Sequence, residues 1–424
     1  MKRGSMVRAI IFSVLFLALG SITAQEPQQQ KPPEEQKPAE PAEKPLEPGW
    51  FSLDCCIGVI DAKIAEGKGV VQDALGIGIA GYLETTYVWG SRHPKDPSFL
   101  SGRYFYEDFN KMQFNDFHIA LSKPEKDWGV GFQLSGDFGR TGQLLREATL
   151  WGPTLQKEPS AELRESYITT TIPLGSGIQF KGGLFVTPLG TEILPVPGNY
   201  NDQITRSFAF NYGVPLRHLG TLFTYQALKT LSVSGGLVTG WDDPYDNNGT
   251  PSFLGGVNFT PMDSFGLASY IVAGPEQFHN EKHTRVTWSN VATVKPMDLL
   301  TLYLEYTFGV EQKASTPTGT KNAQWYAFSV VGSYSWTDRF STSLRTELFL
   351  DQGASRTQGF AATKPIFNVA LGEVTLAGTY KLTKMFLARA EFRQDWATRS
   401  VFKRGANNAS PNQTTLAFQL IYTY

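Results

Sequence analysis

Residues 300–308, Leu-Thr-Leu-Tyr-Leu-Glu-Tyr-Thr-Phe, decide the fold class. Successive side chains of an extended chain point to opposite faces, so this stretch has one apolar and one mainly polar face. The apolar face carries Leu300, Leu302, Leu304, Tyr306 and Phe308, and the other face carries Thr301, Tyr303, Glu305 and Thr307. The period of two predicts a β-strand exposed to two different environments.

Two further stretches repeat this pattern and add full charges of both signs in mid-strand. In residues 340–351 the polar face carries Ser341, Ser343, Arg345, Glu347 and Asp351, and in 384–395 it carries Arg389, Glu391, Arg393 and Asp395. Soluble β-sandwiches also contain two-sided strands. Repeated mid-strand charge instead suits the water-filled interior of a barrel whose outer face meets lipid.

The spacing of such stretches predicts about sixteen strands. They lie near 77–89, 113–122, 128–138, 163–173, 177–187, 216–226, 230–240, 252–260, 264–273, 284–294, 298–309, 324–335, 339–350, 368–380, 384–395 and 413–424. Short turns, such as 261–263 and 337–338, alternate with longer loops at 139–162, 188–215, 310–323, 351–367 and 396–412. This alternation favours an all-β, transmembrane, antiparallel up-and-down barrel with short periplasmic turns. An even strand count places both barrel ends in the periplasm.

The end of the chain supports the same fold. Residues Leu416, Phe418, Leu420, Tyr422 and Tyr424 alternate up to a terminal aromatic residue. This pattern is similar to the terminal-strand signal read by the bacterial barrel-assembly machinery, which we therefore expect as a partner. Tyr and Trp near the strand ends, among them Trp89, Trp241 and Trp336, are expected to form girdles at the two membrane interfaces.

The first 76 residues predict export. Lys2, Arg3 and Arg8 precede an apolar stretch at 9–19, which is typical of a signal peptide over residues 1–24 and is too short for a spanning helix. Residues 25–48 are rich in Pro, Glu, Gln and Lys and predict a disordered periplasmic linker. Residues 49–76 are expected to form a periplasmic segment, with a short helix as one interpretation, and the barrel is expected over 77–424. The adjacent Cys55 and Cys56 cannot provide a disulfide framework.

Composition and motifs argue against several function classes. A formal net charge of −1 without a concentrated basic surface gives no indication of a nucleic-acid partner. The sequence contains neither an HExxH metal pair nor a GxSxG nucleophile turn, so we expect no enzyme, cofactor or metal. His279 and His283 have helical i, i+4 spacing, but we expect them in a loop beside Gly274 and Pro275 rather than at a metal site.

The inward faces supply the candidate functional residues. Those expected to line the lumen are Glu84, Asp116, His118, Lys181, Glu305, Arg345, Glu347, Glu373, Arg389, Glu391 and Arg393. Their charges could brace neighbouring strands or select ions. Loop 188–215 is the longest and is the candidate to fold inward as a constriction, carrying Glu192, Asp202 and Arg206. The alternative is an extracellular loop without a special role.

Several short pieces together resemble the OmpL-like β-barrel porin family over roughly residues 80–424. They are Gly81-Tyr82-Leu83-Glu84, Gly190-Thr191-Glu192, the stretch 199–212 with Arg206-Ser207, Gly240-Trp241-Asp242 followed by Asn247-Asn248, and residues 389–395. The resemblance implies an outer-membrane barrel with a porin role. The linker and the cysteine pair lie outside it.

The sequence therefore predicts a porin-like protein of the bacterial outer membrane, which forms a water-filled channel for passive diffusion of ions or small hydrophilic solutes. Its expected surroundings are outer-membrane lipid, and both a homotrimer and a monomer are compatible with the sequence. The alternatives are an adhesin or receptor that displays extracellular loops, and an outer-membrane hydrolase with residues assembled from distant strands.

Overall fold

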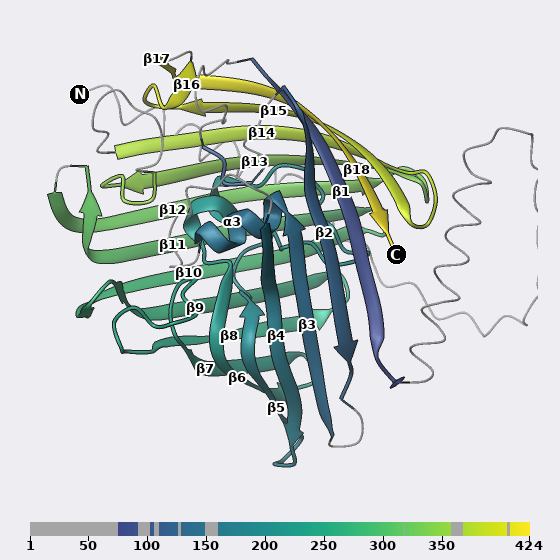
Figure 1. Cartoon of the computed structure of the whole chain (residues 1–424), viewed down its shortest axis with the longest axis vertical. Coiled ribbons are helices and arrows are strands. Elements are labelled where there is room, and N and C mark those ends of the chain that lie inside the picture. Colours follow the sequence, from purple (N-terminus) through teal and green to yellow (C-terminus); the bar gives the residue numbers. More distant parts are fainter. Residues whose placement is uncertain are drawn as a thin grey trace, which may run out of the picture. The chain divides into compact units, whose positions relative to one another are not determined.

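Sixteen strands form one closed antiparallel barrel (Figure 1). The computed structural model describes residues 75–91, 102–105, 110–125, 129–148, 160–317, 319–357, 368–404 and 408–424. The predicted signal peptide, the linker and nearly all of segment 49–76 lie outside these residues. Among the described helices, none is long and apolar enough to cross a bilayer.

Each barrel strand pairs with its neighbours in sequence order, and the last strand pairs with the first to close the ring. The strands are β1 (Gly78–Gly90), β2 (Met112–Lys123), β3 (Val130–Gly139), β4 (Ser160–Ile172), β5 (Ile178–Val186), β6 (Arg217–Leu228), β7 (Leu231–Val238), β8 (Ser252–Met262), β9 (Phe265–Gln277), β10 (Asn280–Met297), β11 (Leu300–Thr316), β12 (Gly319–Ser335), β13 (Phe340–Gln352), β14 (Asn368–Lys381), β15 (Phe386–Ala397) and β18 (Asn412–Thr423). All sixteen predicted strands are confirmed, with most ends shifted by a few residues.

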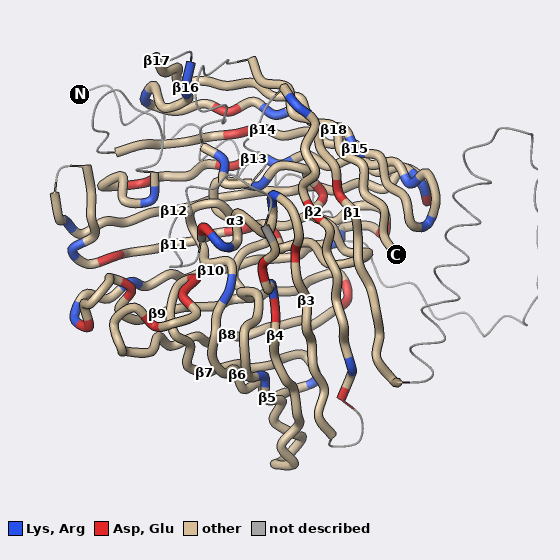
Figure 2. The backbone as a smooth tube through the Cα atoms, viewed as in Figure 1, with Lys and Arg blue, Asp and Glu red and all other residues tan. Residues whose placement is uncertain are grey.

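The alternation in the sequence corresponds to the two faces of the wall. Leu344 on β13 pairs with Leu376 on β14, and both side chains are about half exposed on the outside. Their neighbours Arg345 and Glu347 point inward and are almost fully buried. Figure 2 shows acidic and basic positions part-way along the strands as well as at the hairpin ends. The charges are therefore built into the inner wall.

Two predicted connections are wrong. Residues 310–323 were expected as a long loop, but β11 continues to Thr316 and β12 begins at Gly319, whose φ is +101°. His283 was expected in a loop with His279 but lies in β10, while His279 occupies a tight turn at φ +54°. In both hairpins the ladder is interrupted by a register shift, between Asn280 and Thr284 in β10 and between Glu311 and Ala314 in β11, and pairing resumes beyond it.

The interior is filled at the end of the barrel that carries the longer connections. It contains helix α3 (Arg140–Ala148), one π-helical turn η1 (Ala209–Gly213) and the small hairpin β16 (Phe402–Arg404) and β17 (Asn408–Ser410). Three apolar clusters pack there, and every one includes residues of the connection between β5 and β6. That connection is the predicted loop 188–215, so it is the common element of the packed interior.

If the outer face of the wall contacts lipid, a charge placed on that face should destabilise the barrel. Replacing Leu376 with Arg puts a charge near mid-strand on the outer face, which costs about 2–4 kcal/mol at a bilayer midplane. We expect the free energy of unfolding from lipid vesicles to fall by that amount in urea titrations. Leu376→Ala is the control for the lost side chain. Equal stability of the Arg and Ala variants would contradict a lipid-facing position.

Candidate functional site

Loop 188–215 crosses the interior and is hydrogen-bonded to separate parts of the wall, including β1 and β12, which lie five strands apart in the ring. On one side, the Tyr82 hydroxyl of β1 donates to the carbonyl of Pro195 at 3.4 Å. On the other, the hydroxyl of Ser333 on β12 donates to Asp202 at 3.1 Å. The loop therefore lies inside the ring of strands.

Carboxylates of the barrel wall accept hydrogen bonds from backbone N–H groups of the loop. Glu391 accepts from Ile204 at 2.6 Å and from Thr205 at 3.0 Å. Glu347 accepts from Phe208 and Ala209, both at 2.6 Å, and Glu305 accepts from Thr191 at 3.0 Å. An irregular buried segment has no strand partner for its N–H groups, so these charge-assisted bonds replace the missing ladder.

Buried arginines complete this attachment. Arg345 donates to Glu192 of the loop at 2.7 Å and to the carbonyl of Thr205 at 2.9 Å, and it pairs with Glu373. Arg393 pairs with Asp395 at 2.6 Å and with Glu373 at 3.3 Å. Both guanidinium side chains are 0% exposed. The charges of these residues are therefore neutralised within the protein.

The attachment predicts the protection of specific amides. In Glu391→Ala, the N–H groups of Ile204 and Thr205 lose their acceptor, and a buried unsatisfied group costs roughly 1–3 kcal/mol. We expect their hydrogen exchange to accelerate by about tenfold or more, since 1.4 kcal/mol corresponds to a factor of ten. Glu281→Ala, at an exposed position on β10, is the matched control. Unchanged exchange at both amides would show that Glu391 does not hold the loop.

A second buried network lies on β1 to β4. The carboxylates of Asp116 and Asp137 both accept from Arg164, and Asp137 also bonds Nδ1 of His118 at 2.9 Å. Among the described residues, Asp116, His118 and Asp137 are the one group with ligand atoms close enough to hold a metal ion. Arg164 already supplies the positive charge between the two carboxylates. The arrangement is therefore an ion-pair network that also bonds Pro195 of the loop through Arg164.

Sequence reasoning missed Arg164 for a physical reason. The pairing of β3 with β4 shifts register between Ser135 and Gly136, where Arg164 is the extra residue on β4. A β-bulge turns two consecutive side chains to the same face. Arg164 and Glu165 are accordingly both buried, although strict alternation assigns them to opposite faces. The sequence held one signal of the bulge: Leu163 and Glu165 are two residues apart and should share a face, yet one is apolar and the other is charged.

The remaining predicted residues are more dispersed. Glu84 is buried on β1 opposite Asp116, and Arg389 donates to Gln419 at 2.8 Å. Lys181 is separate from both networks and lies 4.6 Å from the centre of the Tyr167 ring. In the loop, the guanidinium of Arg206 lies 5.4 Å from the centre of the Phe210 ring. The structure thus gathers most of the predicted residues around the loop and leaves Lys181 apart.

Toward the short turns, the inner wall is less enclosed and mostly uncharged. The half-buried inward residues of β11 to β14 there are Thr301, Tyr303, Ser333, Ser341 and Thr379. Asp202 of the loop contacts this region through Ser333. Burial raises the pKa of Asp202, and the hydrogen bond from Ser333 opposes this shift. Hydroxyl groups that can bind water line this part of the interior.

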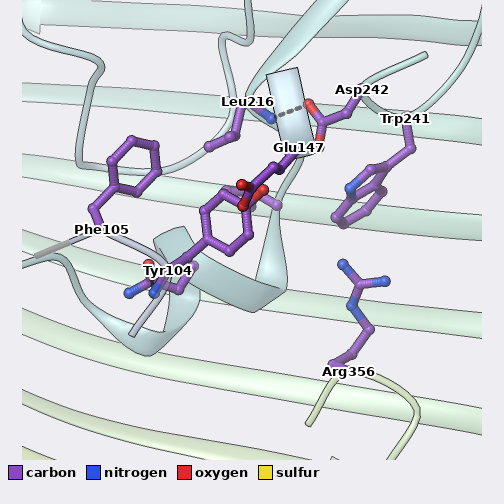
Figure 3. Close-up of a pocket in the computed structure, with 9 residues that line it drawn as sticks. Tyr104, Phe105, Glu147, Leu216, Trp241, Asp242 and Arg356 are labelled. Atoms are coloured by element: carbon purple, nitrogen blue, oxygen red, sulfur yellow. Dashed lines mark hydrogen bonds between the residues drawn. The ribbon is translucent and has the colours of Figure 1, made fainter. Parts of the chain in front are cut away.

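At the opposite end of the loop, a cavity of about 230 Å³ opens between the longer connections (Figure 3). Asp242 lies on its rim, and its Oδ1 accepts from the N–H groups of Leu216 at 2.6 Å and Arg217 at 2.9 Å. Burial raises the pKa of Asp242 to about 6, and the two N–H groups, Arg217 and Arg356 limit the rise. Asp242 has a left-handed backbone conformation, with φ of +57°. Such conformations cluster at functional sites.

The raised pKa of Asp242 predicts a pH dependence of stability. The folded state binds this proton more tightly than the unfolded chain, whose pKa is about 3.9. The contribution is therefore present below about pH 4 and is lost as the pH rises through about 6. In Asp242→Asn the amide oxygen can still accept both N–H groups. We expect urea titrations to show the wild type losing, relative to this variant, at most about 3 kcal/mol across that window. A difference that does not change with pH would contradict the assignment.

Comparisons with known proteins agree with the architecture. The family model described as "putative beta-barrel porin-2, OmpL-like" matches residues 76–424. The outer membrane channel DcaP of Acinetobacter baumannii has a similar structure, with TM-score 0.58 and 11% identity over 82% of this chain and 97% of that one. The anion-selective porin from Comamonas acidovorans gives 0.56 and 9%, covering 82% and 99%. Salmonella typhi OmpF, in complex with daunomycin, gives 0.53 and 11%, covering 82% and 97%. No curated protein matches the sequence.

Proposed function

The chain belongs to the family of OmpL-like β-barrel porins of the bacterial outer membrane, and from that premise we propose that it conducts ions and small hydrophilic solutes by passive diffusion. The observation that carries the proposal is the closure of sixteen strands around an inner face of hydroxyl and charged side chains. A ring of this size is wide enough for an aqueous channel. A protein built as a passage needs no catalytic residues.

Loop 188–215 forms the constriction in this proposal. Its backbone is attached to Glu305, Glu347 and Glu391 on three different strands, so it narrows the passage without moving freely. The buried arginines on β13 and β15 brace the loop. Ion preference then depends on charged groups that meet water beside the loop, and Asp202 is the loop carboxylate that contacts the hydroxyl-lined region.

The terminal strand has a second role in the proposal. β18 presents Leu416, Phe418 and Leu420 on its outer face and pairs with β1 to close the barrel. It is the strand that the barrel-assembly machinery would recognise before closure. Structures similar to this chain include a trimer form of OmpT of Vibrio cholerae. A homotrimer and a monomer are therefore both assembled states to test.

Single-channel recording in a planar bilayer tests the conduction. We expect discrete, reproducible current steps from the purified, refolded barrel. A barrel that inserts, shifts on heating in gel electrophoresis and never conducts would overturn the channel proposal. Display of the extracellular loops to a receptor or surface would then be the function to test, with hydrolysis at the outer rim after it.

Charge reversal at the loop tests the constriction. In Asp202→Lys, a negative charge beside the passage becomes positive, so cations are less favoured there. We expect the reversal potential in a KCl gradient to shift toward anion preference. Asp263→Lys, at an exposed position in the turn between β8 and β9, is the matched control for net charge. Identical reversal potentials for the two variants would place Asp202 outside the ion path.

A further inference from the structure

The cavity at the long-loop end is assembled from five separate connections. Its lining comes from the segments between β1 and β2, β3 and β4, β5 and β6, β7 and β8, and β13 and β14. The lining residues Asn211 and Val214 belong to the interior loop itself, so the cavity adjoins the constriction. Its volume of about 230 Å³ is far above the roughly 10–15 Å³ that a cavity needs to hold one water molecule. It is therefore sized for a small solute.

Arg356 supplies a positive charge to this cavity. Its Nε donates to the carbonyl of Tyr212 at 2.7 Å, and its guanidinium lies 4.6 Å from the centre of the Trp241 ring and 5.2 Å from that of Trp325. Within the part of the chain that the structure describes, its two terminal nitrogens have no hydrogen-bond partner. The side chain is therefore held in place by its Nε and the two rings, while its strongest donors remain available.

Two carboxylates face the same space. Glu147 of α3 accepts from Gln143 at 2.7 Å through one oxygen, and Asp242 uses one oxygen for the N–H groups of Leu216 and Arg217. In the described residues, the second oxygen of each carboxylate has no hydrogen-bond partner. Figure 3 shows the Arg356 guanidinium and the two carboxylates approaching the cavity from opposite sides. The lining of one cavity thus carries charges of both signs.

The rest of the lining is apolar or aromatic. Phe105, Val214 and Leu216 are buried, and the ring of Trp241 lies between the two charged sides (Figure 3). Aromatic and aliphatic surfaces of this kind accept the body of a ligand while a few polar groups fix its orientation. A matching solute therefore has an anionic group, a cationic group and a short apolar part.

We propose that this cavity binds a small zwitterionic solute of the α-amino-acid type, with its carboxylate on Arg356, its ammonium group on Asp242 and Glu147, and its side chain against Phe105 and Trp241. The inference rests on the proposed channel function and adds the class of solute that the channel prefers. Bound there, the solute lies directly on the loop that narrows the passage, which raises its concentration at the entrance.

Other solute classes fit the charges less well. A simple anion on Arg356 would face two carboxylates, and a simple cation on the carboxylates would face Arg356. A neutral sugar could stack on Trp241, but it would bring no charge to either side. Groups that lose water without a matched partner reduce affinity, so only the zwitterion satisfies both sides at once.

The test uses leucine as the zwitterionic probe in planar-bilayer recordings at neutral pH. We expect leucine added on the long-loop side to interrupt the potassium chloride current in a saturable manner. Arg356→Gln and Asp242→Asn should each raise the half-blocking concentration by at least about tenfold, since each removes one charge-assisted contact. Arg356→Lys keeps the cation and should retain part of the block. Arg399→Gln and Glu281→Gln, both at exposed positions, are the matched controls, and leucine should block them at the same concentration as the wild type.

The outcomes separate the two proposals. Wild-type current without any block by leucine would overturn the zwitterion site and leave the channel intact, whereas absence of current would overturn the channel itself. Acetate and ethylamine serve as the anionic and cationic probes. If Asp242→Asn strengthened the block and acetate blocked better than leucine, the site would bind simple anions, and the zwitterion proposal would be overturned. Block by leucine that survives both Arg356→Gln and Asp242→Asn would also overturn the proposal.

Discussion

Within a bilayer every backbone N–H and C=O group needs a partner inside the protein, and this structure meets that constraint by pairing β1 with β18. Closure uses the hydrogen-bonding groups of the strands on each other. A loop that enters the ring finds no free strand edge there. The loop between β5 and β6 therefore bonds to side chains, and the wall supplies acceptors at Glu305, Glu347 and Glu391. The inner face carries charged side chains because the wall is closed and the enclosed loop needs side-chain partners for its backbone.

The same network bears on what the inner charges do. Removing a charged group from water is costly unless it is paired and hydrogen-bonded. Arg345, Glu373 and Arg393 are fully buried and bonded to one another or to the loop, so their contacts favour bracing over ion selection. Asp202 and Arg356 differ, because each lies next to a region that water can enter. The charges on the strands are thus paired inside the protein, whereas Asp202 and Arg356, which lie in connections between strands, border the open spaces.

The sequence predicted the strands well and the site in part. Strands such as β13 and β15 follow from period-two alternation, because the wall separates two environments along its whole length. Alternation failed at Arg164, where a bulge turns two neighbours inward. It also could not place Arg356 near Asp242, because these residues meet through five connections that have no periodic pattern. The inward position of loop 188–215 was predictable from its length, whereas its carboxylate attachments depend on tertiary contacts.

The attachments limit how the passage can be regulated. If the loop moved away from the wall, Glu347 and Glu391 would lose the hydrogen bonds that they accept from its N–H groups. The arginines that donate to its carbonyls, such as Arg345, would lose their acceptors as well. Each buried group left unsatisfied costs roughly 1–3 kcal/mol, so an open state without the loop would be rare. Selection must then rely on fixed geometry, and a solute that binds beside the loop need not displace it. The charges on the cavity rim are where such a fixed filter can act.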